Sequence, residues 1–356
     1  MPTRQRSNFN PLVTPTDVIP SRPDFEVVCA FNAAVAKYNG ETLILMRVAE
    51  RPKCENAYTV KSPHLIEKNG KYELEIKTFD KVKDSEKYDF SDPRKFFLNA
   101  DREIAYLTSI SHLRLARSKD GVNFTVDPKP FIKPETKYEA FGTEDARITK
   151  INNKYYINYT AVSSKGISTA LAVTEDFITV KRIGIAFEPD NRDVCFLPEK
   201  VNGMYIALTR PAPKQFGKAE IWMAESPDLL HWGNHKHLLG VSGDAWDSLK
   251  LGGGAQVLKT SKGWLEIYHG VDKDNRYCLG ALLLDINDPE KILARSKTPL
   301  LEPEADYELK GFFKNVVFSC GALIEDNILK VYYGGADRVM ALAEMSMNEL
   351  WNHLEL

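Results

Sequence analysis

Apolar and polar residues alternate over short stretches along most of this sequence, a period of two that predicts β-strands. Five of these strands follow a tight turn rich in Asn and Gly, residues that tolerate the positive φ of a two-residue hairpin. The turns are Asn39-Gly40, Asn152-Asn153, Asn202-Gly203, Lys262-Gly263 and Asp326-Asn327, and the strands after them span residues 42–48, 155–162, 204–209, 264–270 and 328–334. A sixth turn, Asn69-Gly70, is assigned to an outer hairpin.

A further strand follows each of these, with small residues alternating with larger ones. These strands span residues 112–118, 168–174, 219–226, 278–285 and 338–346. Each block therefore supplies about four strands, and radial repetition of four-stranded sheets protects strand edges from pairing with other chains. The repeat predicts an all-β fold, a five-bladed β-propeller that occupies residues 1–356 as a single domain. A β-sandwich or two small β domains would also contain many short strands.

Two segments depart from the repeat. The charged stretch near 73–101 is predicted to be an insertion into the first blade, forming an extended loop or a short helix on the rim. Helical composition is confined to residues 347–356 and 81–98, and neither segment is expected to carry chemistry.

Composition narrows the possible partners. The chain has 47 Lys and Arg residues against 49 Asp and Glu residues. We therefore do not expect a basic surface that binds nucleic acid or another polyanion. The first ten residues lack the apolar run of a signal peptide, and no stretch is apolar enough to span a membrane, so the predicted location is cytoplasmic. The five cysteines are odd in number and widely spaced, which favours reduced thiols and predicts no structural metal.

Polar residues at the ends of the innermost strands of a propeller converge on one funnel, which is where a site is expected. The most informative stretch is 141–148, where Glu144, Asp145 and Arg147 lie at the mouth of a predicted strand. Either acid could protonate a leaving oxygen. The other candidates are Asn32, Arg47, Arg192, Asp193, Arg210, Lys250, His269, Asp272, Tyr277 and Asp337.

Each candidate also has a structural interpretation. Asp145 could be a turn acid paired with Arg147, and His269 could be a buried core imidazole. Arg210 and Lys250 could be surface cations. The run Gly252-Gly253-Gly254 lacks the context of a nucleotide-binding loop, so it is assigned to close backbone approach at the funnel.

Taken together, these residues resemble glycoside hydrolase family 130, the mannoside phosphorylases and related β-mannosidases, which have a five-bladed β-propeller fold. The resemblance covers nearly the whole chain and is strongest to members that act on β-1,2-linked mannosides. It rests on segments 31–34 with Arg47, 142–147, 198–200, 208–211, 225–228, 268–270, 315–318 and 333–337.

The resemblance implies a role for each matched residue. Asp145 would be the general acid, although Ala146 stands where the family usually has Pro. Glu144 joins Asn32, Arg47 and Asp337 in the predicted substrate-binding set, the last three holding the mannose at the donor subsite. The predicted phosphate-binding residues are Arg192, Arg210, Lys250, His269 and Tyr277. No cofactor is implied, because inorganic phosphate is itself a substrate, and homo-oligomers are common in the family.

The sign of the charge at two of the matched positions favours phosphorolysis over hydrolysis. Family hydrolases carry acids where this chain has Arg210 and Lys250, and a phosphorylase needs cations there to hold a dianion in line with the anomeric carbon. The predicted activity is reversible, inverting phosphorolysis of β-1,2-mannobiose or manno-oligosaccharides to α-mannose 1-phosphate, with the proton of Asp145 passing directly or through a sugar hydroxyl. The alternatives are a phosphate-independent β-mannosidase that uses Glu144 or Asp193, a β-1,4-mannosyl-glucose phosphorylase, and a non-catalytic sugar-binding propeller.

Overall fold

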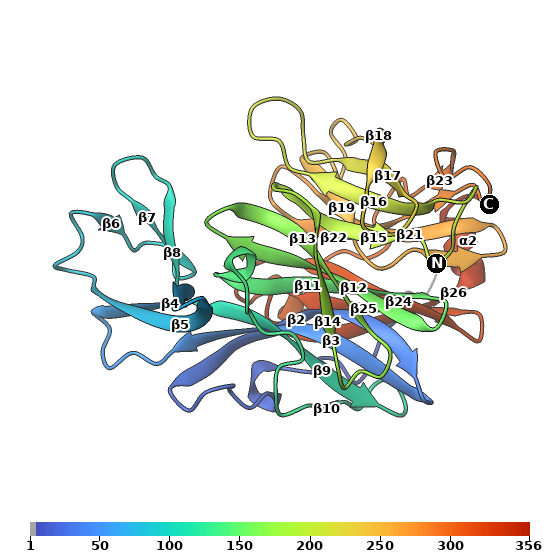
Figure 1. The fold of residues 1–356 in the computed structure, drawn as a ribbon. Coiled ribbons are helices and arrows are strands. Elements are labelled where there is room, and N and C mark those ends of the chain that lie inside the picture. The colour runs from blue at the N-terminus through green and yellow to red at the C-terminus, as the bar shows by residue number, and fades with distance from the viewer. Residues whose placement is uncertain (1–4) are drawn as a thin grey trace.

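The structure, a computed structural model, describes residues 5–356. Over these residues the chain is mostly β, and its main strands form five antiparallel units, numbered 1 to 5 in chain order, beside a separate arm of further strands (Figure 1). The predicted fold class is therefore confirmed as mostly β. None of the helices within 5–356 is long and apolar enough to cross a membrane.

Units 1 and 2 form one continuous sheet, joined by a single parallel pair, Gly142 opposite Ser111. Unit 1 contains β2 (Phe25–Tyr38), β3 (Glu41–Pro52), β9 (Ile110–Ser118) and β10 (Thr125–Val126). Unit 2 contains β11 (Gly142–Ile151), β12 (Lys154–Ser163), β13 (Gly166–Thr174) and β14 (Lys181–Phe187). Two 3-10 turns, Pro15–Asp17 and Lys137–Glu139, precede β2 and β11.

The remaining units follow the same order of strands. Unit 3 contains β15 (Asn191–Phe196), β16 (Tyr205–Pro211), β17 (Ile221–Ser226) and β18 (Gly233–Leu239). Unit 4 contains β19 (Lys250–Gly253), β20 (Leu258–Thr260), β21 (Gly263–Val271), β22 (Tyr277–Leu284) and β23 (Ile292–Arg295), with β19 and β20 both paired to β21. Unit 5 combines β24 (Val317–Glu325), β25 (Ile328–Gly335) and β26 (Val339–Ser346) with β1 (Gln5–Arg6) from the other end of the chain.

The five hairpin turns lie where the sequence placed them. Asn39, Asn152, Asn202 and Asp326 have φ angles of 49°, 55°, 51° and 50°, and the outer turn at Asn69 has 53°. Asn and Asp adopt this left-handed conformation at lower cost than other residues with a Cβ. The turn residues therefore fixed the strand register, which is why the repeat could be read from the sequence.

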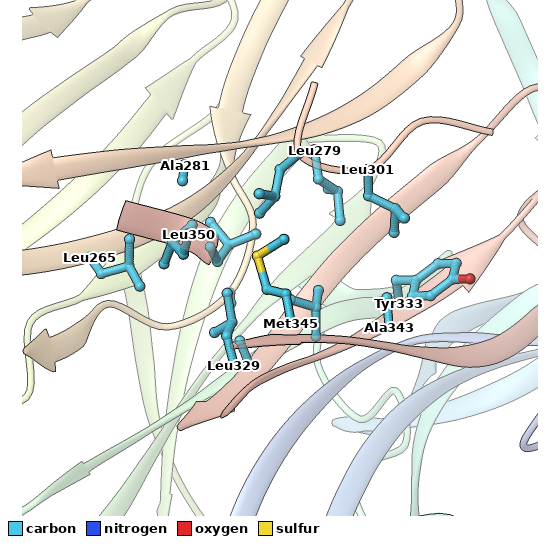
Figure 2. Close-up of a cluster of buried hydrophobic side chains, with 14 of the residues drawn as sticks. Leu265, Leu279, Ala281, Leu301, Leu329, Tyr333, Ala343, Met345 and Leu350 are labelled. Carbon is cyan, nitrogen blue, oxygen red and sulfur yellow. The ribbon is translucent and has the colours of Figure 1, made fainter. Parts of the chain in front are cut away.

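Buried apolar clusters lie between consecutive units and also between unit 5 and unit 1. Neighbouring residues of one strand serve different clusters: Trp264 packs toward unit 3, whereas Leu265 packs toward unit 5. This alternation explains why many central strands are apolar on both faces. The cluster between units 4 and 5 also includes Leu350 and Trp351 of the C-terminal helix α2 (Met347–His353), which confirms the helix predicted there (Figure 2).

The insertion differs from its prediction. It is an arm made of β4 (Thr59–Lys68), β5 (Lys71–Asp80), β6 (Tyr88–Asp89), β7 (Lys95–Leu98) and β8 (Ile104–Leu107), and it projects to the left in Figure 1. The helix predicted over 81–98 is wrong, and so is the loop expected for 73–101. Rings of Phe79, Tyr88, Phe96 and Tyr106 pack against one another, so an aromatic cluster drawn from several short strands organises this segment.

A second short helix, α1 (Asp306–Leu309), carries the buried Glu308 beneath unit 5. Its carboxylate accepts bonds from Arg6 and from the hydroxyl of Tyr333, 2.6 Å away. Through these bonds, Glu308 ties the N-terminal strand β1 to the C-terminal unit by side chains as well as through the sheet.

Candidate active site

One cavity of about 250 Å³ is lined by residues from all five units. The ten residues given a catalytic or binding role by the family resemblance all lie on its wall: Asn32, Arg47, Glu144, Asp145, Arg192, Arg210, Lys250, His269, Tyr277 and Asp337. Arg94, Asp193, Phe313, Val316 and Phe318 complete the lining. Arg192 and Arg210 thus face the same cavity as Asp145, and the predicted convergence of the strands is confirmed.

A β-bulge places a polar side chain on this wall in three of the units. The register of β2, β11 and β15 shifts at Asn32, Asp145 and Asp193, whose φ angles are 49°, 44° and 54°. A bulge adds one residue to a strand and changes the direction in which its side chain points. Left-handed backbone at a residue with a Cβ is strained, and such strain often marks functional positions. The repeat therefore provides one redirected polar group in each of these units.

Asp145 lies in a donor-rich environment. Asn32 Nδ2 donates to its Oδ1 at 3.1 Å, and Arg47 Nη1 lies 3.4 Å from the same oxygen. Arg47 Nη2 also donates to Glu144 at 2.6 Å, so one guanidinium joins the two adjacent acids. Ala146, the departure from the family motif, is fully buried in the core between units 1 and 2 and leaves this arrangement intact.

Two other acids in the cavity are easier to protonate than usual. Burial raises the pKa of Asp337 to about 7, with the nearby Asp145 and Glu144 adding to the rise against the opposing effect of Arg47. Burial likewise raises the pKa of Glu144, although Arg47 opposes it. At neutral pH, Asp337 is therefore partly protonated, so its carboxyl can donate hydrogen bonds to sugar hydroxyls in one form and accept them in the other.

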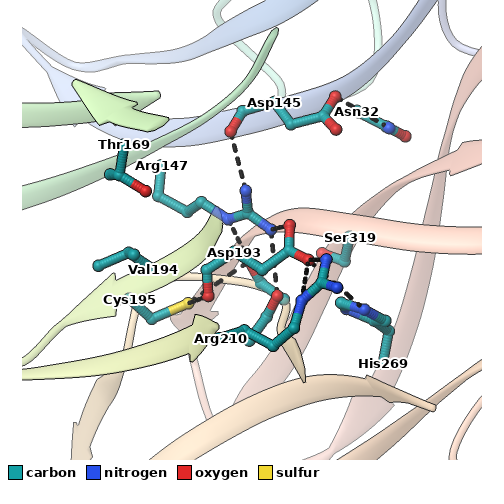
Figure 3. A network of polar contacts seen from close by, with 12 residues as sticks. Asn32, Asp145, Arg147, Thr169, Asp193, Val194, Cys195, Arg210, His269 and Ser319 are labelled. Atoms are coloured by element: carbon teal, nitrogen blue, oxygen red, sulfur yellow. Dashed lines mark hydrogen bonds and ion pairs between the residues drawn. The ribbon is translucent and has the colours of Figure 1, made fainter. Parts of the chain in front are cut away.

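Asp193, on the wall of the cavity, is held in a buried network of polar contacts (Figure 3). Arg210 donates to it through Nε at 3.1 Å and also through Nη2, and Arg147 Nη2 donates at 3.2 Å. Burial alone would raise the pKa of Asp193, but Arg210, Arg147 and His269 outweigh it and hold that pKa well below its usual range. Arg147 also donates to the backbone oxygen of Asp145 at 2.8 Å, so it links the acid to the cation side of the cavity.

The other cations of this wall are less constrained. Arg192 Nε is buried and has no hydrogen-bond partner within residues 5–356. Lys250 Nζ lies 4.9 Å from the ring centroid of Tyr277. Burial, with Arg210 and Arg192 adding to it, lowers the pKa of Lys250 to about 8. The wall around Arg192 and Lys250 is therefore suited to an anion that would supply the missing negative charge.

Buried polar atoms rarely lack partners, so each exception requires an explanation. In the part of the chain that is described, Asn32 Oδ1, Arg192 Nε and His269 Nδ1 are buried and unpartnered, and all three residues line this cavity. Burial also lowers the pKa of His269 to about 3, so its ring is neutral at physiological pH. A ligand bearing both donors and acceptors would satisfy these atoms.

The glycine run permits close packing beneath the cavity, as the sequence predicted. A Cβ on Gly254 would lie 2.1 Å from the carbonyl oxygen of Ile267, and one on Gly253 would lie 2.5 Å from Cys195 Sγ. The carbonyl oxygens of both glycines accept bonds from Arg147. A larger residue at either position would force apart the backbone that carries these carbonyl oxygens, and so disturb the bonds that hold Arg147.

The structure also separates the alternatives considered for single residues. Arg210 is only 7% exposed and is paired with Asp193, so it is not a surface cation. Asp272 does not line the cavity and instead pairs with Arg276 at 3.0 Å in the turn before β22. Sequence reasoning missed Arg94 and Phe313, because both lie outside the innermost strands on which the search was based.

Comparison with known proteins agrees with this geometry. The family profile Glyco_hydro_130, described as beta-1,4-mannooligosaccharide phosphorylase, matches residues 105–356. The chain is 50% identical to the beta-1,2-mannobiose phosphorylase of Listeria innocua over 99% of this chain and 98% of that protein. The chain belongs to glycoside hydrolase family 130.

Two further matches place it within the family. A 1,2-beta-oligomannan phosphorylase from a Thermoanaerobacter species is 42% identical over 68% of this chain and 80% of that protein. The solved structure of the Listeria innocua beta-1,2-mannobiose phosphorylase in complex with beta-1,2-mannobiose superposes with a TM-score of 0.93 over 98% of each chain. The fold described above is therefore the family 130 fold.

Proposed function

We propose that this protein is an inverting phosphorylase of β-1,2-linked mannosides, which converts mannobiose or a manno-oligosaccharide and phosphate to α-mannose 1-phosphate and a shortened sugar. One observation carries the proposal: a single cavity holds Asp145 with Arg47 and Asn32 on one side and Arg192, Arg210 and Lys250 on another. Relatives that are 50% and 42% identical to this chain are named as phosphorylases of the same linkage, whereas relatives that are 30% and 26% identical are named for β-1,4-linked mannosides.

The architecture proposed for the site is a five-bladed propeller that forms one domain. The five sheet units pack in order, and the cluster between unit 5 and unit 1 would close the ring. Closure brings the inner strands of every unit to one central cavity, which a linear stack of sheets would not do. This accounts for the contribution of all five units to a site of modest volume.

The reaction follows from these positions. A phosphate oxygen held by the cations attacks the anomeric carbon of the donor mannose on the face opposite the glycosidic bond, so the β-linkage becomes an α-phosphate. The bond from the anomeric carbon to the glycosidic oxygen breaks, and the proton of Asp145 reaches that oxygen directly or through a mannose hydroxyl. Asn32, Arg47 and Asp337 hold the donor sugar, and positioning of the reacting groups in this way supplies much of the rate enhancement of an enzyme.

The two acids that the hydrolytic alternative would use as a base, Glu144 and Asp193, are both paired with arginines. Asp193 is occupied by Arg210 and Arg147, and Glu144 is paired with Arg47 at 2.6 Å. An inverting hydrolase needs a carboxylate that is free to accept a proton from water. At Arg210 and Lys250 the cavity wall instead carries positive charge, which suits phosphate.

Phosphate dependence tests the proposal. Incubation of the protein with β-1,2-mannobiose is expected to release mannose rapidly with inorganic phosphate and negligibly without it. Equal release in both reactions would replace the phosphorylase with a mannosidase, and no release in either would favour a sugar-binding protein.

The pH dependence of phosphate use provides a second prediction. Because the pKa of Lys250 is lowered to about 8, its positive charge is lost as pH rises through that value. We expect kcat/KM for phosphate to fall above about pH 8, and Lys250→Arg to move this fall to higher pH because a guanidinium stays charged. Initial rates at limiting phosphate between about pH 6 and pH 10 measure it.

The control for this profile is Lys273→Arg, an exposed lysine in the turn that follows β21. Its profile should match that of the unmodified protein. A fall that stays in place in Lys250→Arg would assign the titration to another group.

A further inference from the structure

The arm inserted between β3 and β9 contributes one side chain, Arg94, to the catalytic cavity. Its backbone is fixed to the root of the arm, where Thr108 Oγ1 donates to the oxygen of Pro93 at 2.7 Å and Thr108 N donates to the oxygen of Arg94 at 2.9 Å. The residue therefore has a defined place relative to unit 1, although the arm itself projects away from the sheets (Figure 1).

The guanidinium of Arg94 has a fixed orientation as well. Its Nε and Nη2 donate to the two carboxylate oxygens of Asp92 at 3.0 and 2.7 Å, and its Cζ lies 5.3 Å from the ring centroid of Phe313. Asp92 therefore occupies one edge of the planar guanidinium group, and Phe313 covers one of its faces. Nη1 forms no hydrogen bond within residues 5–356, and the side chain remains 35% exposed.

Arg94 is separated from the proposed phosphate site by aromatic rings. Phe313 packs edge-on against Tyr277 at 6.1 Å, and Lys250 lies over Tyr277. Arg94 instead lies near Asp337, where its charge opposes the rise in the pKa of that carboxyl that burial causes. Its side chain is 35% exposed, against 20% for Arg47 and 17% for Asp145, so it stands at the outer part of the sugar-binding end, beyond the residues assigned to the donor mannose.

The charge of the pair distinguishes it from Arg192 and Lys250, the two predicted phosphate-binding cations that pair with no carboxylate within residues 5–356. Asp92 neutralises Arg94, so the pair presents directional N–H donors with little net charge, whereas Arg192 and Lys250 present charge to the cavity. A dianion gains most from unneutralised cations, and a neutral hydroxyl gains from an oriented donor. The ring of Phe313 beside it provides an apolar surface of the kind on which a pyranose packs.

We propose that Arg94 positions the leaving sugar of the phosphorolysis reaction. Its Nη1 would donate a hydrogen bond to a hydroxyl of the mannose or shortened oligosaccharide that is released. This inference rests on the proposed function and deepens it. The arm thereby determines which acceptor sugars are used in the reverse reaction. Asp92 and Phe313 hold the guanidinium of Arg94, the hydrogen-bond donor, in place.

Kinetics of Arg94→Ala and Arg94→Lys in both directions test this assignment. Removing the charged donor should raise KM for β-1,2-mannobiose and for mannose as acceptor by roughly ten- to hundredfold, with KM for phosphate and α-mannose 1-phosphate close to wild type. Lys should restore little, because an ammonium cannot reproduce the fork held by Asp92.

The matched control is Arg102→Ala. Arg102 lies in the same arm, pairs with Asp89 at 2.6 Å and packs over Phe97, but it does not line the cavity. It should leave every kinetic constant near wild type. A rise in KM for phosphate in Arg94→Ala would assign Arg94 to the anion instead, and a lowered melting temperature with unchanged KM values would leave it only a structural role.

Calorimetric titration with β-1,2-mannobiose in the absence of phosphate keeps the two proposals distinct. If the wild-type protein showed no phosphate-dependent turnover, the proposed function would fail, and the titration would still decide whether Arg94→Ala weakens sugar binding. Equal affinity of the wild type and Arg94→Ala, or no binding by the wild type, would overturn the role assigned to Arg94.

Discussion

Replacing Asp145 with Asn is expected to lower kcat for phosphorolysis by about 10²- to 10⁴-fold, because the amide cannot supply a proton to the leaving oxygen. Asn is nearly isosteric and can still accept a bond from Asn32, which lies 3.1 Å from the carboxylate oxygen, so β-1,2-mannobiose should continue to bind. Initial rates at saturating substrates and a calorimetric titration of the variant measure the two quantities separately.

The control is Asp326→Asn, which makes the same change at an exposed turn residue with nearly the same backbone conformation. The φ angles are 50° at Asp326 and 44° at Asp145, so any cost of left-handed backbone is matched. The control should keep wild-type turnover. An Asp145→Asn variant that turned over at near the wild-type rate would remove Asp145 from the reaction.

The second large effect is expected on stability. Changing Asp193 to Asn leaves Arg210 and Arg147 buried without their shared carboxylate, and removing one partner of a buried ion pair costs about 3–5 kcal/mol of unfolding free energy. Activity should fall as well, because Arg210 loses the bonds that orient it toward the cavity. Denaturant titration followed by intrinsic fluorescence measures the stability change.

Asp24→Asn provides the comparison. Asp24 pairs with Arg22 at 2.9 Å, but both side chains are about half exposed, at 46% and 49%, so the change should stay within about 1 kcal/mol. Equal losses in the two variants would mean that the buried network contributes no more than a surface pair.

The same network has a pH signature of definite sign. The pKa of Asp193 is well below its usual range in the folded protein, so its contribution to stability is present above the unfolded-state pKa of about 4 and is lost as pH falls below that value. In Asp193→Asn this part of the acid sensitivity should be absent.

The repeat and the site could be predicted because local chemistry encodes both. Asn39, Asn152 and Asn202 adopt a left-handed backbone conformation that few other residues accept at low cost. The hairpins could therefore be predicted without any tertiary information. Arg192 and Lys250 lie at the start of their strands, where the order of strands brings them together, whereas Asn32 lies in the middle of β2 and reaches the cavity through a bulge. Once five repeated units were recognised, convergence of these positions followed.

The arm could not be predicted in the same way. Its fold depends on Phe79, Tyr88, Phe96 and Tyr106 meeting from separate short strands, and their charged neighbours gave the segment the composition of a helix. Arg94 reaches the cavity only because of that arrangement, so no local pattern marks it. The Asp-Pro-Arg sequence at 92–94 is a weak signal at best, since Pro favours a turn there and Asp92 is near enough to pair with Arg94.

The central claim is that phosphate, held by cations in the same cavity as the proposed proton donor Asp145, is the nucleophile. Time-resolved NMR of β-1,2-mannobiose with the protein and inorganic phosphate tests it most directly. We expect α-mannose 1-phosphate to be the first mannosyl product, with one equivalent of mannose released for each phosphate consumed. Free mannose forming from both halves of the disaccharide while the phosphate signal stays unchanged would contradict the account.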